Sequence, residues 1–301
     1  MTKAILKKMQ QICKGRVLMD ELMSKHTYFK IGGPADFYVY PGNMEELVVL
    51  LDLCKQNGLK PFIIGNGTNL LISDAGFRGM VIDISKTFNQ IQCHGYQVAA
   101  GAGVILTNLH RYCKDRGLAG LEPLFGIPGQ VGGGVRMNAG AYGTEIFDLI
   151  TYVKYLDESG VLMTRPVGDI EFGYRYTSIP ETAIVVEVGI QLDDGNPKEI
   201  EILQQKYMKR RRASQPLSLP SAGSIFKRPP GDYAGRLIEE SGCKGLRIGD
   251  AMVSRKHANF IVNCGLATAD NVLRLVEEIQ NRVFERFQVR LEMEVLKVGF
   301  V

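Results

Sequence analysis

Hydrophobic and polar residues recur with two different periods along the 301 residues of the chain, and these periods predict its helices and strands. Apolar residues three or four positions apart form one face of a helix. Helices are therefore expected within residues 1–23, 44–57, 106–116, 198–213, 234–241 and 269–287. Gly58 directly follows the second of these segments and should end that helix, because glycine readily adopts the left-handed conformation found there.

Strands are predicted where apolar residues run together, or alternate with polar ones, between turn residues. The expected strands lie at 36–40, 61–64, 80–84, 151–156, 161–164, 183–192 and 289–295. In the last of these, Leu291 and Met293 face one way, while Glu292 and Glu294 face the other. The strands within 151–192 are joined by turns and should pair antiparallel.

The order of these elements divides the chain into three parts. Strand, helix and strand within 36–64 predict a βαβ crossover in a first part at about residues 24–100. A second part, 101–195, holds the antiparallel strands, and a third, 196–301, holds three of the helices. The polar stretch from Asp193 to Pro197 is the clearest boundary in the chain.

Composition predicts a globular protein with an ample core, since 45% of the residues are hydrophobic and 23% are charged. The 36 basic and 32 acidic residues nearly balance, so nucleic acid binding is not indicated. Six dispersed cysteines without a Cys-x-x-Cys pair predict neither a zinc site nor a disulfide framework. Lysines interrupt the N-terminal apolar residues and no uncharged stretch reaches ~18 apolar residues, so we expect a soluble cytoplasmic protein without membrane contact.

Candidate chemistry gathers in a glycine-rich segment, where residues 126–143 contain seven glycines in 18 positions and no acidic residue. A chain with few side chains exposes backbone N–H groups, which can hold a phosphate closely. An earlier loop, from Gly65 to Leu70, follows the apolar run 61–64 and has the same character. Two such loops predict one extended ligand that carries phosphate, although the glycines of either loop alone also suit ordinary tight turns.

The common dinucleotide motifs do not fit these loops. Residues 101–103 open like the Rossmann fingerprint, but Leu106 stands where the third glycine belongs. No acidic residue follows in a βαβ context at the expected distance of about 20 residues. The Gly-Lys-Ser/Thr of nucleotide hydrolases is also missing at the required spacing. A different dinucleotide fold is therefore needed.

Six segments, in order along nearly the whole chain, carry a resemblance to a known enzyme family. They are residues 26–36, 65–71, 126–143, 174–176, 221–229 and 294–295. The first reads His-Thr-Tyr-Phe-Lys-Ile-Gly-Gly-Pro-Ala-Asp, and the fifth reads Ser-Ala-Gly-Ser-Ile-Phe-Lys-Arg-Pro. Together these segments resemble the UDP-N-acetylenolpyruvoylglucosamine reductases, also called UDP-N-acetylmuramate dehydrogenases, and their number and spacing make the resemblance specific.

The resemblance implies an α+β fold, in which a two-subdomain FAD-binding fold of the vanillyl-alcohol-oxidase type, residues 1–195, precedes a UDP-sugar-binding α+β domain, residues 196–301. It implies NADPH-dependent reduction of UDP-N-acetylglucosamine enolpyruvate to UDP-N-acetylmuramate in peptidoglycan synthesis. The expected cofactors are NADPH and non-covalent FAD, and the expected state is a monomer. The residues implied in holding FAD are Gly65, Asn66, Gly67, Thr68, Asn69, Leu70, Gly126, Pro128, Gly129, Gly132, Gly133, Asn138, Gly140 and Ala141.

Three residues match the catalytic positions of the family. Arg175 is implied to hold the substrate carboxylate and the developing enolate, since arginine stays cationic and presents a planar fork to a carboxylate. Ser224 is implied to donate the proton to the carbanion. Glu294 is implied to act with Arg175, and burial of that end of the chain would favour its protonated form. Taken alone, each residue has an ordinary structural interpretation.

Basic residues supply the candidates for substrate binding. Arg212 matches an arginine that the family uses near its substrate, and we predict that it binds the diphosphate or the carboxylate. Lys227 and Arg228 are weaker candidates for the same role. The cations at 209–211 are predicted only to end a helix, where positive charge suits the macrodipole, and His257 is predicted to be structural.

Two alternatives to this reductase remain open. One is an FAD oxidase or dehydrogenase of the same fold that acts on an alcohol or a sugar, although Thr68 stands where such oxidases often carry a flavin-linking histidine. The other is a non-enzymatic module that binds a nucleotide-sugar or a flavin. Residues 191–202 pass directly into a helix and 229–242 is short, so the chain resembles the compact form of the family, without the extra tyrosine-bearing loop.

Overall fold

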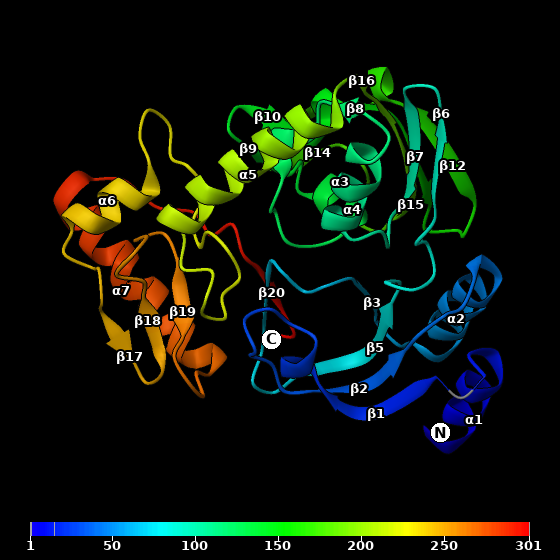
Figure 1. The fold of residues 1–301 in the computed structure, drawn as a ribbon. Coiled ribbons are helices and arrows are strands. Elements are labelled where there is room, and N and C mark those ends of the chain that lie inside the picture. The colour runs from blue at the N-terminus through cyan, green and yellow to red at the C-terminus, as the bar shows by residue number, and fades with distance from the viewer. Residues whose placement is uncertain (1, 15, 301) are drawn as a thin grey trace. The chain divides into compact units, whose positions relative to one another are not determined.

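The computed structural model describes residues 2–14 and 16–300, and it shows a mixed architecture of helices and strands (Figure 1). The chain forms two compact units, each built from stretches that are discontinuous in the sequence. The first unit contains residues 1–17, 38–65 and 81–211, and the second contains residues 18–37, 66–80 and 212–301. Among the described residues, no helix is both long and apolar enough to span a membrane.

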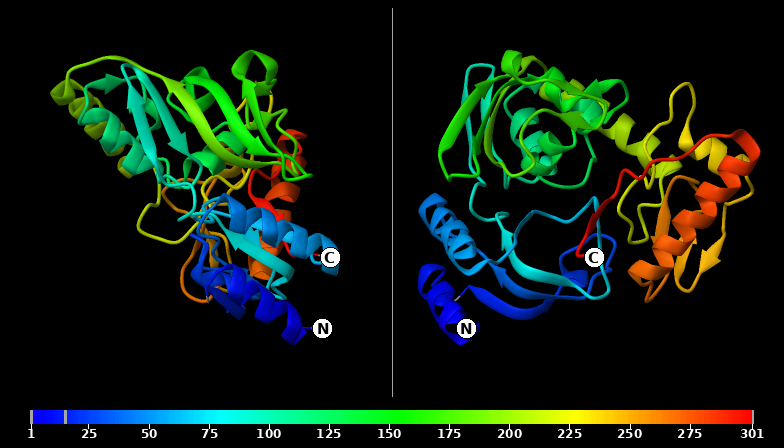
Figure 2. Two further views of the ribbon diagram at one scale, coloured as in Figure 1. Left: turned by 90° about the vertical axis from the view of Figure 1, so that its right-hand side faces the viewer. Right: turned by 180° about the vertical axis from the view of Figure 1, so that it is seen from behind.

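A five-stranded antiparallel sheet organises the first unit (Figure 2). In spatial order its strands are β12 (Leu162–Pro166), β11 (Ile150–Leu156), β15 (Ile184–Gln191), β7 (Gln97–Gly101) and β6 (Ile91–His94). The antiparallel strands expected within 151–192 are thus confirmed. The sequence pattern misses the β6–β7 hairpin, because Ile91 is the one large apolar residue of β6.

Helices and short strands complete the first unit. Helix α4 (Val131–Arg136) contacts β15 and β7, and α3 (Leu106–Lys114) lies close to it. The short paired strands are β8 (Leu118–Ala119) with β16 (Asp193–Asp194), β9 (Gly140–Ala141) with β10 (Thr144–Glu145), and β13 (Phe172–Gly173) with β14 (Tyr176–Thr177). The 3-10 turns are η2 (Glu122–Leu124), η3 (Ile146–Asp148) and η4 (Val167–Asp169). Helix α5 (Pro197–Ser214) belongs to this unit up to Arg211.

A four-stranded sheet has the order β1 (Val17–Leu22), β2 (Pro34–Val39), β5 (Phe77–Asp83) and β3 (Pro61–Ile64). The residues of β1, β2 and β5 are divided between the two units. Helix α1 covers Thr2–Ile12 only, so the helical prediction for 1–23 is wrong at β1. Pairing with the edge of β2 overrides the local helical spacing there.

Helix α2 (Met44–Asn57) has the predicted bounds, and both of its ends are capped. The Asn43 side chain accepts a hydrogen bond from the Glu46 N–H at 2.8 Å, and Gly58 ends the helix in the left-handed conformation with φ 63°. Strands β2 and β3, on either side of α2 in the sequence, lie in one sheet with β5 between them. The helix therefore connects strands that are two positions apart.

Helix α7 (Ala269–Phe287), also with the predicted bounds, forms the core of the second unit. Its buried stripe packs with helix α6 (Ala234–Glu240) and with the three-stranded sheet of β17 (Arg247–Ile248), β18 (Ala251–Val253) and β19 (Ile261–Asn263), as Figure 2 shows from behind. The Asp74 carboxylate accepts the N–H groups of Ala269 at 2.8 Å and Asp270 at 3.0 Å, which suits the positive end of the helix dipole. The 3-10 turn η1 (Met23–Lys25) and the parallel pair β4 (Leu70–Ile72) and β20 (Leu296–Val298) complete this unit.

The last predicted strand, 289–295, differs from the structure in its bounds. The alternation is present, since Leu291 and Val295 are buried while Arg290 and Glu292 are exposed. However, this segment makes only an isolated bridge between Met293 and Phe226, and regular strand pairing begins at β20. The facing segment is too short to form a continuous ladder, so alternation reports burial here and not a strand.

Candidate active site

One side of the glycine-rich segment packs tightly against neighbouring residues, and the other side is open. A Cβ at Gly132, in the first turn of α4, would lie 2.9 Å from the Ala102 Cβ, so only glycine fits there without movement. At the neighbouring Gly133, which is exposed, a Cβ would meet no atom within 4 Å among the described residues. Backbone packed behind and open in front is the arrangement that lets a bound group approach the main chain closely.

The two glycine-rich loops meet within the first unit. A Cβ at Gly65 would lie 2.1 Å from Oε1 of Gln130, the residue that precedes α4. The buried Gln130 side chain donates a hydrogen bond from Nε2 to the Gly103 carbonyl at 2.9 Å. Gln130 therefore joins the end of the first loop to the second, which is the proximity expected if both loops serve one extended ligand.

The rest of the first loop belongs to the second unit and is fixed from two sides. Gly67 has φ 59°, and a Cβ there would lie 2.3 Å from the His26 carbonyl oxygen. The Tyr28 N–H donates to the Gly67 carbonyl at 3.1 Å, and Asn69 donates from Nδ2 to the Glu294 carbonyl at 3.2 Å. Three of the segments that carried the family resemblance are thus brought together.

Arg175 is held against the glycine-rich segment in a strained conformation. Asn138, Tyr142 and Arg175 all have positive φ, at 39°, 53° and 56°. Such non-glycine outliers persist only where surrounding contacts fix them, and they cluster at functional sites. The contacts are present here, because the buried Asn138 donates to Gly173 O at 2.9 Å and Arg175 Nη1 donates to Asn138 O at 3.4 Å. The Arg175 guanidinium also lies 4.9 Å from the Tyr174 ring centroid.

Ser224 and Glu294, although far apart in the sequence, come together in the second unit. The Glu294 N–H donates to the carbonyl of Ile225, the residue after Ser224, at 2.8 Å. Ser224 is also bridged to Phe260 on the other side of the same short segment. Both side chains are half-buried. The structure therefore places a hydroxyl and a carboxyl group on neighbouring backbone, whereas Arg175 belongs to the first unit.

The two predicted substrate-binding cations lie in different settings. Arg212 is exposed at the start of the second unit, and its carbonyl accepts a hydrogen bond from Lys256. Lys227 Nζ lies 2.5 Å from Oε1 of Glu292, so a bound anion would compete with this carboxylate. In both arrangements the positive charge, of Arg212 or of Lys227, remains accessible to solvent.

Arg211 is a functional candidate that the sequence interpretation missed. Its side chain is only 7% exposed and packs at Gly126, where a Cβ would lie 3.3 Å from the arginine Cδ and Nε. Its guanidinium lies 6.0 Å from the Tyr142 ring centroid. A signal was available, because Ile200, Gln204 and Arg211 are buried at helical spacing along α5, whereas Lys209, Arg210 and Arg212 are exposed.

Two histidines near these segments are neutral at neutral pH. Burial lowers the pKa of His110 to about 4, and its ring packs edge-on against Phe125 at 5.4 Å. Burial also lowers the pKa of His257, whose Nδ1 accepts the N–H of Asn259 at 3.2 Å. Both rings therefore act as packed, uncharged groups, in line with the structural role expected for His257.

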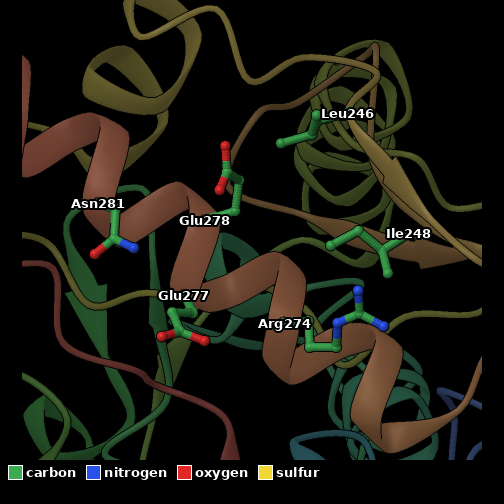
Figure 3. Close-up of a pocket in the computed structure, with 6 residues that line it drawn as sticks. All are labelled: Leu246, Ile248, Arg274, Glu277, Glu278 and Asn281. Atoms are coloured by element: carbon green, nitrogen blue, oxygen red, sulfur yellow. The ribbon is translucent and has the colours of Figure 1, made fainter.

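An open groove of about 330 Å³ lies elsewhere on the second unit (Figure 3). It is lined by Leu246 and Ile248 and by a polar face of α7 that presents Arg274, Glu277, Glu278 and Asn281. Arg274 pairs with Asp270, and Glu278 pairs with Arg282. None of the residues predicted for the active site lines this groove, so it plays no part in the candidate site.

Comparison with known proteins accounts for both the glycine-rich loops and the segments that carry Ser224 and Glu294. Residues 35–164 match the family model of an FAD binding domain, and residues 215–298 match that of the C-terminal domain of UDP-N-acetylenolpyruvoylglucosamine reductase. The glycine-rich loops fall in the first match, together with the open approach at Gly133. Ser224 and Glu294 fall in the second.

Relatives of the whole chain agree with these matches. The UDP-N-acetylenolpyruvoylglucosamine reductase of Alkaliphilus oremlandii is 45% identical over 94% of this chain and 93% of its own length. That of Caldanaerobacter subterraneus subsp. tengcongensis is 44% identical over 99% of both. The crystal structure of the Thermus caldophilus enzyme superposes with a TM-score of 0.82 at 37% identity, covering 93% of this chain and 98% of the other. The expected α+β fold, with an FAD-binding domain followed by a C-terminal domain, is confirmed, and the chain belongs to the UDP-N-acetylenolpyruvoylglucosamine reductase family.

Proposed function

We propose that this protein is the NADPH-dependent flavoenzyme that reduces UDP-N-acetylglucosamine enolpyruvate to UDP-N-acetylmuramate in peptidoglycan synthesis. The observation that carries the proposal is the hydrogen bond from the Glu294 N–H to Ile225 O, because it places the residue that carries a carboxyl group on backbone next to that of Ser224. A hydroxyl and a carboxyl group at one place suit the protonation of an enolate. The family of the chain supports the same reaction.

The residues present fit FAD, which supplies the hydride when bound. Gly133 offers openly approachable backbone beside Gln130, which joins the two loops, and we assign the dinucleotide to this region and to the other glycine-rich positions predicted from the sequence. Asn138 holds the far end of that segment in its left-handed conformation. The division into an FAD-binding domain at 1–195 and a substrate domain at 196–301 remains a proposal, as do a monomeric state and a cytoplasmic location.

The chain's own groups supply the remaining chemistry. Arg175 is assigned to the substrate carboxylate, since its charge is fixed and its guanidinium is held by the hydrogen bond to the Asn138 carbonyl. Ser224 is assigned to donate its hydroxyl proton to the substrate carbon next to the carboxylate and to regain a proton from solvent. Glu294 is assigned to the enolate oxygen. Arg212 and Lys227 are assigned to the anionic groups of the UDP-sugar, and Arg211, by its burial at Gly126, joins them as a candidate.

The direct test is turnover with the purified protein. We expect a yellow flavin spectrum and NADPH oxidation that requires the enolpyruvyl UDP-sugar. Flavin reduction by an alcohol or a sugar, without turnover of the enolpyruvyl substrate, would favour an oxidase or dehydrogenase of the same fold. Flavin or UDP-sugar binding without any turnover would favour a binding module.

FAD should be released when the protein is denatured. The loops at 65–70 and 126–143 contain no histidine or cysteine that could form a covalent bond to the isoalloxazine. After acid precipitation, the yellow colour should therefore appear in the supernatant. Colour that stays in the pellet would show a covalent flavin and contradict this prediction.

Arg212→Ala should raise the KM for the UDP-sugar roughly tenfold while leaving kcat nearly unchanged. An interaction made equally in the ground and transition states contributes to binding but not to turnover, and one charge-assisted hydrogen bond accounts for a change of about this size. Steady-state kinetics measure both constants. Lys209→Ala, which removes another exposed cation of α5, is the matched control and should change neither. A loss of kcat at unchanged KM would place Arg212 at the chemical step instead.

A further inference from the structure

Asn259 makes an unusually complete set of contacts with the segment that carries Ser224. Its side chain is 7% exposed, and its Oδ1 accepts the Phe226 N–H at 3.0 Å while its Nδ2 donates to the Phe226 carbonyl at 2.8 Å. Its own carbonyl accepts the Ile225 N–H at 2.9 Å. One residue thus makes three hydrogen bonds to the two residues that follow Ser224.

The two side-chain bonds fix the orientation of the amide. A side-chain amide offers an acceptor and a donor on one planar group, so it can satisfy both the N–H and the carbonyl of Phe226 at once. These backbone groups are buried, and a buried polar group without a partner is costly. The backbone at Phe226 therefore depends on Asn259 for its position.

Ile225 also connects to the residue that carries the carboxyl group of the candidate site. The Glu294 N–H donates to the Ile225 carbonyl at 2.8 Å, whereas the Asn259 carbonyl accepts from the Ile225 N–H. Ile225 and Phe226 are each 1% exposed, so packing leaves them little freedom. Asn259, Ile225 and Glu294 form one continuous hydrogen-bonded path, and Ser224 is attached directly to its centre.

We propose that Asn259 is a positioning residue for the proton transfer, holding Ser224 and Glu294 in register through the backbone of Ile225 and Phe226. This inference rests on the proposed function, because it assumes that Ser224 donates the proton. Asn259 itself does not contact the substrate in this proposal. Its effect is to set where the Ser224 hydroxyl lies.

Two substitutions separate the amide contacts from the fold. Asn259→Asp keeps an acceptor for the Phe226 N–H but sets a carboxylate oxygen against the Phe226 carbonyl, which weakens the clamp by repulsion. Asn259→Ser removes both side-chain contacts without adding charge. Asn263 is the matched control, since it is a 3% exposed asparagine of the same unit whose amide binds Phe29 O, Gly265 N–H and Ala267 N–H instead.

Stopped-flow measurement of the two half-reactions tests the proposal. In the Asn259 variants, reoxidation of the reduced flavin by the enolpyruvyl UDP-sugar should slow by roughly 10²-fold, the effect typical of a small misplacement of a reacting group. Flavin reduction by NADPH should stay near the wild-type rate. Asn263→Asp and Asn263→Ser should leave the ratio of the two rates unchanged.

A double substitution gives the sharper result. Since Asn259 acts mainly through Ser224, adding Asn259→Ser to Ser224→Ala should cost much less rate than Asn259→Ser costs in the wild-type protein, whereas independent effects would multiply. Multiplying effects, or equal slowing of both half-reactions, would overturn the positioning role. So would failure of both Asn259 variants to fold and bind flavin while both Asn263 variants do so. If the wild-type protein does not reoxidise with the substrate at all, the proposed function itself has failed.

Discussion

Ser224→Ala should slow reoxidation of the reduced flavin by the enolpyruvyl substrate by at least ~10²–10⁴-fold, the range for a lost general acid, while leaving flavin reduction by NADPH near normal. The carbon that receives the proton is strongly basic only after hydride has been added to its neighbour. A proton donor therefore contributes to the second half-reaction and not to the first. Single-turnover traces of each half-reaction measure the two rates separately.

Ser221→Ala is the matched control for this substitution. Ser221 is also half-buried and lies three residues before Ser224 in the same segment, so its loss should leave both half-reactions near the wild-type rates. If Ser224→Ala damages both halves equally, Ser224 shapes the pocket and does not donate the proton.

Arg175→Met and Glu294→Ala should each lower turnover by roughly 10²–10³-fold, the effect of losing one preorganised group that stabilises developing charge. Methionine at position 175 keeps a Cβ and a long side chain, so the left-handed backbone with φ 56° is strained to the same degree in both proteins. Steady-state kcat at saturating substrate, with bound flavin as a check on folding, gives the comparison.

The control for the carboxyl group is Glu292→Ala. Glu292 lies two residues before Glu294, is exposed and pairs with Lys227, so its removal should leave kcat near the wild-type value. Should Glu294→Ala retain wild-type turnover while flavin remains bound, Glu294 is an ordinary half-buried carboxylate without a role in the reaction.

Local signals predicted the helices well, because their ends are fixed by residues close in sequence. The bounds of α2 follow from its apolar spacing and from Gly58, and those of α7 follow from a stripe that the structure buries completely. Where pairing with a distant segment decides the conformation, local patterns failed. Apolar spacing predicts a helix where β1 forms, and alternation predicts a regular strand at 289–295, where the structure has an isolated bridge.

The candidate site was predictable where segments of the chain match those of a known family. Arg175, Ser224 and Glu294 were identified by their match to the family, and the structure adds the backbone contact that brings Ser224 and Glu294 together. Asn259 could not be found in this way, because an asparagine 33 residues from Phe226 carries no local sign of binding it. Nor could Gln130, whose contact at Gly65 depends on two loops meeting in space.

Local sequence patterns also could not predict the two compact units. Strand β20, near the end of the chain, pairs in parallel with β4, so residues 66–80 fold with residues 212–301. The Asp74 contact with the first residues of α7 belongs to the same arrangement. Composition reveals boundaries along the chain. The pairing of segments far apart in the sequence is instead decided by which buried surfaces fit together.

The most direct test of the proposed reaction follows the flavin without oxygen. The protein is reduced with one equivalent of NADPH under anaerobic conditions, and the enolpyruvyl UDP-sugar is then added while the flavin absorbance is recorded. We predict return of the oxidised flavin spectrum together with one equivalent of UDP-N-acetylmuramate by mass. Flavin that stays reduced in the presence of this substrate, with no lactyl ether formed, would contradict the assignment of the chain as the reductase.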